Sequence, residues 1–500
     1  MAAKTSRRKN GAARQARRAA ASNGKPNGHA ANGLNGKQTS GLVFVINMIP
    51  RSLSGETSQD SEPHLTVNPA NRKQIVGTAF TPDPAGGPRA PIYISPDAGL
   101  SWKLNSIVPS VAGSIGTADI TTGFSGKSSR LYAGILNAGN IHLQFLRTLN
   151  PFTPTPMTVL SDRANADQPF TLATKKGAKE LVYIGDNDFN APGGKTETLD
   201  ESLNAGVPAP AFSSIRVEKR STLGQDGPQT RPASHKDGTV YAAFYRWRSS
   251  SGSFPANTLV ITAADVVVVR DDNAGGGSPP FSALVDPGDL VVGRRVVTGV
   301  SFPFMIHGTA ATGQQRLGGS ISVAVDPKDS STVYLVWGDR QPGSVLTLHL
   351  RVSTDRGATW SADALTIPNA TNAAIAVTDS RQIGFLYQQI KGTGASQRWE
   401  THLRRSKDAV NWSDLVLSNT PSTSPAKTFD PYLGDYDHLV ADGKDFCGIF
   451  AANNTPDFSH FPNGVFYQRN ANFGTHQLLK LDGTTVVAPS IDPYFFRVKG

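Results

Sequence analysis

Short stretches in which apolar and polar residues alternate recur along most of the chain. The clearest are 64–67 and 320–325, and each leads through a proline-containing turn into a more apolar stretch, at 74–80 and 332–337. Alternation with a period of two is typical of strands with one buried face, and a short apolar run is typical of a strand buried on both faces. The pattern therefore predicts short strands joined by tight turns.

The first strand of each such unit returns at a regular distance. After the copy that starts at residue 64, further copies start near residues 117, 169, 231, 320, 373 and 432. The successive spacings are 53, 52, 62, 89, 53 and 59 residues. A period near fifty with four short strands per unit predicts a β-propeller. We expect an all-β fold with a single propeller of about seven four-stranded blades, and six blades remain the alternative because 169–318 divides less clearly.

Two long segments interrupt the repeat, and the two ends of the body could close it. Asn190–Phe212 and Asp271–Gly318 stretch the third and fourth units and are predicted to be long surface loops. Leu42–Ile49 and Tyr494–Val498 are both apolar and could share the last blade. Such sharing would pair the strand edges that an open circle leaves unpaired.

The composition supports a β-rich body and sets the N-terminal segment apart from it. Gly (49) and Pro (34) are plentiful, whereas Glu, which favours helices, is scarce. Residues 1–40 contain nine Lys or Arg and no Asp or Glu, which accounts for nearly all of the net charge of +10. We therefore predict a disordered basic arm with a Gly/Asn-rich linker at 1–41 and the propeller at 42–500.

The sequence also bears on the compartment. No stretch approaches the length of a membrane span, and the early apolar run at 42–49 follows forty polar residues, unlike a secretion signal. Cys447 is the one cysteine, so an intrachain disulfide is excluded. A single buried thiol fits a cytoplasmic or other reducing compartment.

Two eight-residue segments share the pattern S-x-D-x-G-x-[ST]-W. They are Ser95–Trp102 and Ser353–Trp360, and a shorter copy without the glycine is Ser406–Trp412. Each lies between an alternating apolar run and a polar stretch, so we expect it to form the turn of a β-hairpin. The Asp can accept a backbone N–H two residues on, the Gly can adopt positive φ, and the Trp can bury its ring beside the turn.

These segments resemble the Asp-box of the bacterial neuraminidase repeat, which occurs in sialidases and sialidase-like β-propellers. In that family the box joins the third and fourth strands of a blade and has a structural role away from the active site. The resemblance implies a propeller that binds a glycan or other anionic ligand at the mouth of its channel. Two alternatives remain open: an active exo-sialidase or related glycosidase, and a structural or assembly protein whose basic arm at 1–40 binds nucleic acid or another polyanion.

The most polar candidate site is Asp430–His438, at the head of the last unit. It contains three carboxylates, two tyrosines and a histidine. Loops that enter the inner strands of a propeller meet at one mouth of the channel, where a ligand site is expected. Sialidases use a tyrosine nucleophile activated by a carboxylate, so the resemblance implies such a role for Tyr436 or Tyr432, with Asp435 nearby. The alternative is that these are turn carboxylates and buried core tyrosines.

Arginines are the second element of the resemblance. Sialidases hold the carboxylate of the substrate with three arginines, whose planar groups suit two-point pairing. Arg231 and Arg316 lie at or before expected inner strands, and Arg51 or Arg381 could be the third. With 49 basic residues in the chain, such positions also arise by chance.

The glutamates do not reveal a sialidase-like pair with a tyrosine. Glu218 and Glu400 are the glutamates that we expect inside blades, and each is predicted to lie in a third strand, away from the channel. A tyrosine–glutamate pair is therefore not visible in the sequence.

A metal site is the last candidate. Asp186 and Asp188 could bind a hard cation such as Ca²⁺ through oxygen ligands. No Glu follows at the distance of the helix–loop–helix calcium motif, so a polar turn is the alternative. The predicted function requires no cofactor, because neither a phosphate-binding loop nor a zinc signature is present.

The basic arm generates a prediction that does not depend on the propeller. If residues 1–40 contact phosphates, the affinity of the full-length protein for nucleic acid should fall steeply with salt, with a log–log slope of about −0.7 to −0.9 per phosphate. Deletion of residues 1–40 should abolish this binding in an anisotropy assay and leave the melting temperature of the body nearly unchanged. Affinity that survives the deletion, or that ignores salt, would assign the binding to another part of the protein.

Overall fold

The fold of the described chain is almost entirely β. The computed structural model describes residues 43–80, 91–109, 117–126, 128–137, 141–190, 194–225, 227–306, 308–425 and 432–500. Within these residues the helical elements are three single 3-10 turns, η1 (Arg51–Leu53), η2 (Gly394–Ser396) and η3 (Phe458–His460). No helix in this part of the chain is long and apolar enough to cross a membrane. The predicted basic arm and its boundary with the body lie outside the described residues.

Six sheets contain four antiparallel strands each, in the order in which the chain forms them. Blade 1 contains β2 (Ser61–Val67), β3 (Ile75–Phe80), β4 (Ile92–Ser95) and β5 (Lys103–Leu104). Blade 2 contains β6 (Thr117–Phe124), β7 (Leu131–Asn137), β8 (His142–Thr148) and β9 (Thr158–Ala164). Blade 3 contains β10 (Ala166–Lys176), β11 (Lys179–Asp188), β12 (Thr196–Ser202) and β13 (Ser213–Arg216).

The second half of the chain repeats this arrangement. Blade 4 contains β14 (Arg231–Ser234), β15 (Val240–Ser251), β16 (Val260–Asp271) and β17 (Arg294–Pro303). Blade 5 contains β18 (Ile321–Asp326), β19 (Asp329–Asp339), β20 (Thr347–Ser353) and β21 (Leu365–Pro368). Blade 6 contains β22 (Ala370–Val377), β23 (Ile383–Lys391), β24 (Arg398–Ser406) and β25 (Ser413–Pro421).

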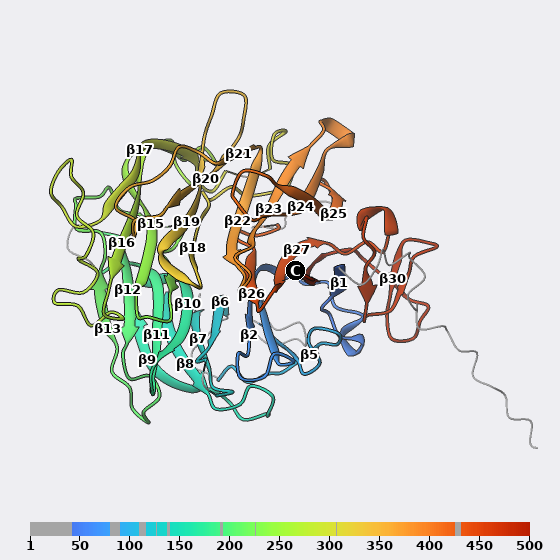
Figure 1. Cartoon of the computed structure of the whole chain (residues 1–500). Coiled ribbons are helices and arrows are strands. Elements are labelled where there is room, and N and C mark those ends of the chain that lie inside the picture. The colour runs from blue at the N-terminus through green and yellow to red at the C-terminus, as the bar shows by residue number, and fades with distance from the viewer. Residues whose placement is uncertain are drawn as a thin grey trace, which may run out of the picture.

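The seventh blade joins the two ends of the body. Its strand order is β26 (His438–Asp442), β27 (Asp445–Asn453), β32 (Ile491–Val498), β1 (Val43–Asn47) and β28 (Phe466–Tyr467). The first strand β1 pairs antiparallel with the last strand β32, from Val43 opposite Val498 to Asn47 opposite Tyr494. Figure 1 shows the blue start of the chain beside its red end. The expected closure of the ring by the two ends is therefore confirmed.

The innermost strands form a closed circle of seven. In chain order they are β2, β6, β10, β14, β18, β22 and β26; each contacts the next, and β26 returns to contact β2. The arrangement confirms a β-propeller with seven blades (Figure 1). A small additional sheet of β29 (Ala471–Asn472), β30 (Gln477–Leu479) and β31 (Val486–Val487) extends from the seventh blade.

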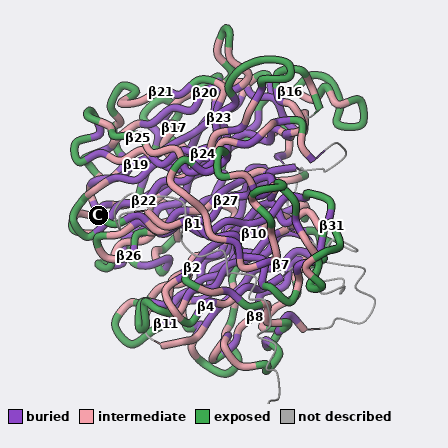
Figure 2. The backbone as a smooth tube through the Cα atoms, turned by 90° about the vertical axis from the view of Figure 1, so that its right-hand side faces the viewer, coloured by how far each residue is buried: buried purple, intermediate pink, exposed green. Residues whose placement is uncertain are grey.

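Apolar side chains fill the space between neighbouring blades. One cluster joins blades 4 and 5 through Tyr245, Phe302 and Trp337, and all three are buried. In Figure 2 the buried stretches follow the strands and the exposed stretches gather in the connecting loops. Cys447 lies in the cluster between blades 7 and 1, where burial raises the pKa of its thiol to about 12. The prediction of a buried structural thiol is confirmed.

Two predicted loops contain strands instead. Asn190–Phe212 includes β12, and Asp271–Gly318 includes β17. The β12 sequence, Thr-Glu-Thr-Leu-Asp-Glu-Ser, lacks an apolar face, yet every residue in it is buried. Two of its acidic side chains contact groups that the local sequence does not contain: Glu197 accepts from Thr230, and Asp200 pairs with Arg163. Prediction from hydrophobic pattern was therefore wrong here, because residues elsewhere in the chain provide partners for buried acidic side chains.

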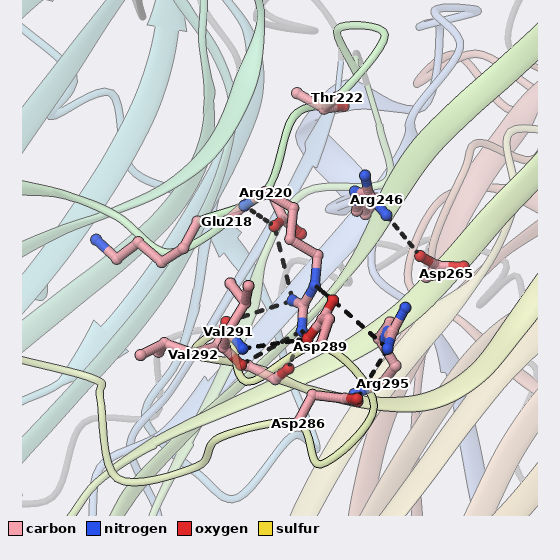
Figure 3. A network of polar contacts seen from close by, with 12 residues as sticks. Glu218, Arg220, Thr222, Arg246, Asp265, Asp286, Asp289, Val291, Val292 and Arg295 are labelled. Atoms are coloured by element: carbon pink, nitrogen blue, oxygen red, sulfur yellow. Dashed lines mark hydrogen bonds and ion pairs between the residues drawn. The ribbon is translucent and has the colours of Figure 1, made fainter.

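The insertion before β17 is fixed by a network of arginines and carboxylates, shown in Figure 3. Arg220, on the segment between β13 and β14, donates to both carboxylate oxygens of Asp289 at 2.8 and 3.1 Å and to the carbonyl of Gly293 at 2.8 Å. Asp286 accepts from the backbone N–H and the guanidinium of Arg295 at 2.8 and 2.9 Å. The insertion is thus tied to the segment that carries the chain from blade 3 into blade 4.

The S-x-D-x-G-x-[ST]-W segments join the third and fourth strands of blades 1 and 5, and the shorter copy does so in blade 6. In each, the residue after the Asp has positive φ: 67° at Ala98, 65° at Arg356 and 58° at Ala409. The indole N–H of each Trp donates to the carbonyl three residues before it, at 3.1 Å. The predicted hairpin turn is therefore present in all three copies.

The hydrogen bonding of the aspartate differs from the prediction in the two complete copies. Asp97 accepts the backbone N–H of Ser101, four residues on, at 2.9 Å, and Asp355 accepts that of Thr359 at the same distance. The N–H two residues on, at Gly99, goes to the hydroxyl of Ser95 instead. In the shorter copy, Asp408 does accept the N–H two residues on. The extra glycine lengthens the turn and shifts the bond.

Each complete turn also packs on the preceding blade. A Cβ added at Gly99 would lie 2.1 Å from the ring of Phe495 in β32, so a glycine is required for this approach. The Trp102 ring lies 5.3 Å from the same phenylalanine and is 2% exposed. Around Gly357, the backbone carbonyl of Arg356 accepts from Arg270 at the end of β16. The turns therefore link neighbouring blades.

We predict that Trp102→Ala lowers the stability of the fold by about 3–5 kcal/mol, as expected for a large buried aromatic side chain. Trp360→Ala should cost less, because this ring is only half-buried. Both variants should retain ligand binding, since the turns follow strands that run away from the mouth of the channel. Chemical denaturation measures the first effect. A Trp102→Ala variant that keeps full stability but loses binding would contradict the structural role.

Candidate active site

A cavity of about 280 Å³ lies at one mouth of the central channel. Its walls come from the starts of β2, β6 and β10 and from the segments that lead into β14, β18 and β26. The polar side chains in its lining are Glu62, Asp119, Asp167, Gln168, Gln229, Arg316, Asp435 and Tyr436. The large apolar ones are Phe80, Leu136, Ile141, Phe304 and Met305. We call this the mouth cavity.

The centre of the polar wall is an arginine between two carboxyl groups. Arg316 donates through Nε and Nη2 to the two carboxylate oxygens of Asp435, at 3.1 and 2.7 Å. The same Nη2 donates to Oε1 of Glu62 at 3.1 Å. The backbone N–H of Asp435 also donates to that oxygen, at 3.1 Å. Two carboxyl groups from different blades are thus held against one guanidinium.

The backbone around these groups is shaped for close approach. Gly434 has a φ of +92°, and a Cβ there would lie 2.3 Å from Cγ of Glu62. Glu62 itself adopts a φ of +50°, which is unusual for a residue with a side chain. A strained backbone conformation of this kind persists only where the surrounding structure requires it. Here the conformation places the Glu62 carboxyl group beside the segment that leads into β26.

Tyr436 and Asp119 form a second polar pair in the wall. The Tyr436 hydroxyl donates to Oδ1 of Asp119 at 2.9 Å, and both side chains are buried. Burial raises the pKa of Tyr436 well above its ordinary value, and the charges of Asp119 and Glu62 raise it further. This phenol therefore stays protonated at neutral pH.

Burial also changes the two carboxyl groups beside this pair. Burial, followed by the charges of Asp119 and Asp435, raises the pKa of Glu62 well above its usual range, although Arg316 opposes the shift. Burial raises the pKa of Asp119 against the hydrogen bond from Tyr436. The mouth cavity therefore contains two carboxyl groups with raised pKa values beside one, Asp435, that is ion-paired.

The structure brings together only part of the predicted site. Tyr436, Asp435 and Arg316 line the mouth cavity. Tyr432 does not: its hydroxyl donates to the backbone carbonyl of Ser424 at 2.5 Å, and its ring is buried between blades. Tyr432 is thus the core tyrosine of the alternative interpretation. Asp430, the first residue of the predicted cluster, lies outside the described residues.

The three-arginine cluster is not formed by the predicted residues. Arg231 lies behind Tyr436, with its guanidinium 3.9 Å from the centre of the Phe170 ring and 5.2 Å from that of Tyr436. Burial lowers the pKa of Arg231 to about 10. Arg381 pairs with Asp326 at the far end of β18, and Arg51 belongs to the exposed turn η1. Of the four arginines, Arg316 alone lines the cavity.

Glu62 and Asp119 are functional candidates that the sequence analysis missed. The prediction that Glu218 and Glu400 are the glutamates inside blades was wrong, because Glu62 lies at the start of the inner strand β2. Glu400 does lie in a third strand, β24, but Glu218 follows the fourth strand β13. The position of Glu62 directly before the alternating stretch at 64–67 was the available signal. Its contact with Asp435, 373 residues away, could not be read from the sequence.

Two stacked histidines lie below the mouth cavity. The rings of His64 and His438, on β2 and at the start of β26, have centres 3.9 Å apart. Burial lowers the pKa of His438 to about 3, with Arg231 contributing, and lowers that of His64 well below its usual value. The pair is therefore neutral in the folded protein at physiological pH.

The predicted cation position at Asp186 and Asp188 is occupied by an arginine. Arg163 in β9 pairs with Asp186 at 3.1 Å and with Asp188 at 2.5 Å, and it also pairs with Asp200. Both aspartates lie in strand β11 and not in a loop. A guanidinium thus lies between the carboxyl groups that were expected to attract Ca²⁺.

A second cluster of carboxyl groups also contains an arginine. Glu56, Asp60 and Asp492 place one oxygen each within 4.8 Å of one another. Arg469 is buried among them and donates to Asp492 at 2.9 Å and to Glu56 at 3.4 Å. A guanidinium again pairs with buried carboxyl groups.

Comparisons with known proteins give a fold-level likeness. No protein-family model and no curated protein matches the sequence. Among solved structures, the chain is similar to a GH93 α-L-arabinofuranosidase of Fusarium graminearum in complex with arabinobiose, with 11% identity, a TM-score of 0.42, and coverage of 90% of this chain and 97% of that chain. It is also similar to the endosialidase of phage phi92, with 12% identity, a TM-score of 0.39, and coverage of 91% and 69%. An α-L-arabinanase of Penicillium chrysogenum is a third, with 13% identity, a TM-score of 0.40, and coverage of 69% and 93%.

The histidine pair generates a prediction for the pH dependence of stability. Because the pKa of His438 is about 3 in the folded state and near the ordinary value of about 6.5 in the unfolded chain, the unfolded chain binds the proton first as the pH falls. Its contribution to stability is therefore complete above about pH 6.5 and is lost towards pH 3. As the pH falls from 7 to 4.5, the melting temperature of His438→Gln should decrease less steeply than that of the wild-type protein. His476→Gln, at an exposed site, is the control; equal slopes for His438→Gln and wild type would contradict the argument.

Proposed function

We propose that the mouth cavity binds a glycan and hydrolyses a glycosidic bond. The observation that carries the proposal is the convergence of Glu62, Asp119, Asp435 and the Tyr436 hydroxyl on one cavity at the axis of the propeller. Hydrolysis of a glycoside requires one carboxyl group that is protonated and one that is ionised, on opposite sides of the bond that breaks. Burial raises the pKa values of Glu62 and Asp119, whereas Asp435 is ion-paired with Arg316, so the environments of these groups differ in the required sense.

The contacts suggest a role for each group. Asp435 is held in a two-point ion pair by Arg316, so it serves as the carboxylate that acts as base or nucleophile. Glu62 and Asp119, whose pKa values burial raises, are the candidates for the general acid that protonates the leaving oxygen. Each faces the same cavity, so a sugar bound there lies within reach of both kinds of group.

A tyrosine nucleophile is less well supported than a carboxylate. The raised pKa of Tyr436 disfavours the phenolate that would have to attack the sugar. Its hydrogen bond to Asp119 instead orients that carboxyl group. We therefore assign Tyr436 the role of positioning Asp119, and we propose a carboxylate mechanism in place of the sialidase-like one.

The remaining walls suit a sugar. A sugar ring has polar hydroxyl edges and apolar C–H faces. The polar wall of the mouth cavity offers carboxyl oxygens that accept hydrogen bonds from hydroxyls, and Phe80, Leu136 and Phe304 provide an apolar wall. A volume of about 280 Å³ lies near the lower end of ligand sites and matches a ligand of one or two sugar units.

The test is turnover of chromogenic aryl glycosides and short oligosaccharides, including arabinobiose, by the full-length protein. Asp435→Asn and Glu62→Gln or Asp119→Asn should each lower kcat by about 10²–10⁴-fold, as loss of a catalytic acid or base does. Tyr436→Phe should lower it by about tenfold, the effect of one lost hydrogen bond. Glu400→Gln, in the third strand of blade 6, is the matched control and should leave kcat unchanged.

Each other outcome has a defined meaning. Turnover that is lost in Tyr436→Phe but kept in Asp435→Asn would replace the carboxylate mechanism with a tyrosine nucleophile. Glycan binding by calorimetry without turnover of any substrate would reduce the proposal to a glycan-binding propeller. Absence of binding to every glycan tested would overturn it.

A further inference from the structure

We infer that the mouth cavity selects an uncharged glycan and that Arg316 positions the carboxyl groups of the site and does not bind a carboxylate of the ligand. The inference rests on the proposed function, because it names the class of sugar that the same cavity accepts. It differs from the expectation of an anionic ligand. The observations that carry it are the charges of the lining and the contacts of its arginine.

The charge of the lining does not suit an acidic sugar. Four of its side chains carry carboxyl groups, Glu62, Asp119, Asp167 and Asp435, and within the described residues Arg316 is the basic side chain among them. If Glu62 and Asp119 are both protonated, two carboxylates still face one guanidinium. Among the described residues, a ligand carboxylate would therefore meet no excess positive charge, and like charges in close contact oppose binding.

Arg316 is already engaged on its carboxylate-binding edge. Its Nε and Nη2 donate to both oxygens of Asp435, and Nη2 also donates to Glu62. The Arg316 side chain is 12% exposed, the Glu62 side chain 2% and the Asp435 side chain 14%. Turning Arg316 towards a ligand carboxylate would leave two buried acidic groups without their cation, which is strongly unfavourable.

Arg231 cannot take over this role. Its side chain is buried, and its guanidinium lies between the rings of Phe170 and Tyr436 at 3.9 and 5.2 Å. Arg231 is absent from the described lining of the mouth cavity, whereas Tyr436 belongs to it. To reach a ligand it would have to leave two aromatic contacts.

An uncharged sugar fits the same wall without rearrangement. Its hydroxyls are donors, and the carboxyl oxygens of Asp435, Asp167 and Glu62 are acceptors. Arg316 meanwhile keeps Glu62 and Asp435 at a fixed separation, because its planar guanidinium donates hydrogen bonds to both carboxyl groups. Arg316 is thus a positioning residue for the two groups that we assign to the reaction.

The decisive experiment compares matched ligands that differ in one carboxylate. We would titrate the full-length protein by calorimetry with lactose and 3′-sialyllactose, and with galactobiose and digalacturonate, at 50 and 300 mM NaCl. Each neutral ligand should bind at least about tenfold more tightly than its acidic partner. Its affinity should not change with salt, because no ligand charge is screened.

The role of Arg316 is tested by Arg316→Met and Arg316→Lys on the best neutral substrate. Both should lower kcat by more than tenfold with KM within about threefold of wild type, because orientation and not ligand binding is lost. Arg316 lowers the pKa of Glu62 and Asp119, so Arg316→Met should also move the upper pH limit of activity to higher pH. Arg381→Met, at a half-exposed arginine that pairs with Asp326 far from the cavity, is the control, and melting temperatures show whether each variant is folded.

The outcomes separate the inference from the proposed function. Tighter binding of the acidic partner, or a rise in KM for acidic substrates alone in Arg316→Lys, would overturn the inference and leave a glycan-binding propeller. Failure of all four ligands and of the wider panel to bind would overturn the proposed function and, with it, the inference.

Discussion

The antiparallel pairing of β1 with β32 is the constraint on which the rest of the structure depends. It joins Val43–Asn47 to Tyr494–Val498 and completes the seventh blade, so that β26 can contact β2. The mouth cavity combines residues from blade 1, such as Glu62, with residues that lead into blade 7, such as Asp435. Without closure of the ring, these two groups would not share one arginine.

Buried carboxyl groups paired with arginines recur in several blades of the propeller. Arg163 of blade 2 pairs with aspartates of blade 3, Arg220 anchors the insertion before β17, and Arg469 pairs with Glu56 and Asp492. Removal of one partner from such a group leaves an uncompensated buried charge, so these pairs specify geometry more than they add stability. The Arg316 cluster belongs to this class, with the difference that it opens on a cavity.

That difference separates structural from functional acidic groups in this protein. Asp186 and Asp188 resemble a metal site in sequence, yet a guanidinium lies between them. Glu62 and Asp119 lie in a cavity wall, where burial raises their pKa values and a ligand can reach them. The same residue types therefore have different roles according to whether solvent and ligand have access.

The sequence by itself determined the repeating unit. Alternation of apolar and polar residues is a local property of each strand, so its repeat along the chain predicted seven blades. The Ser, Asp, Gly and Trp of each turn interact within eight residues, so the sequence motif predicted the hairpins. The same reasoning failed for β12, whose polar residues are buried by partners elsewhere in the chain. Tertiary structure alone decided that Tyr436 and not Tyr432 reaches the cavity, that Arg231 lies behind it, and that Glu62 lies beside Asp435. The physical reason is that the arrangement of the blades around the axis decides which distant residues meet at the mouth of the channel. No local sequence pattern encodes that arrangement.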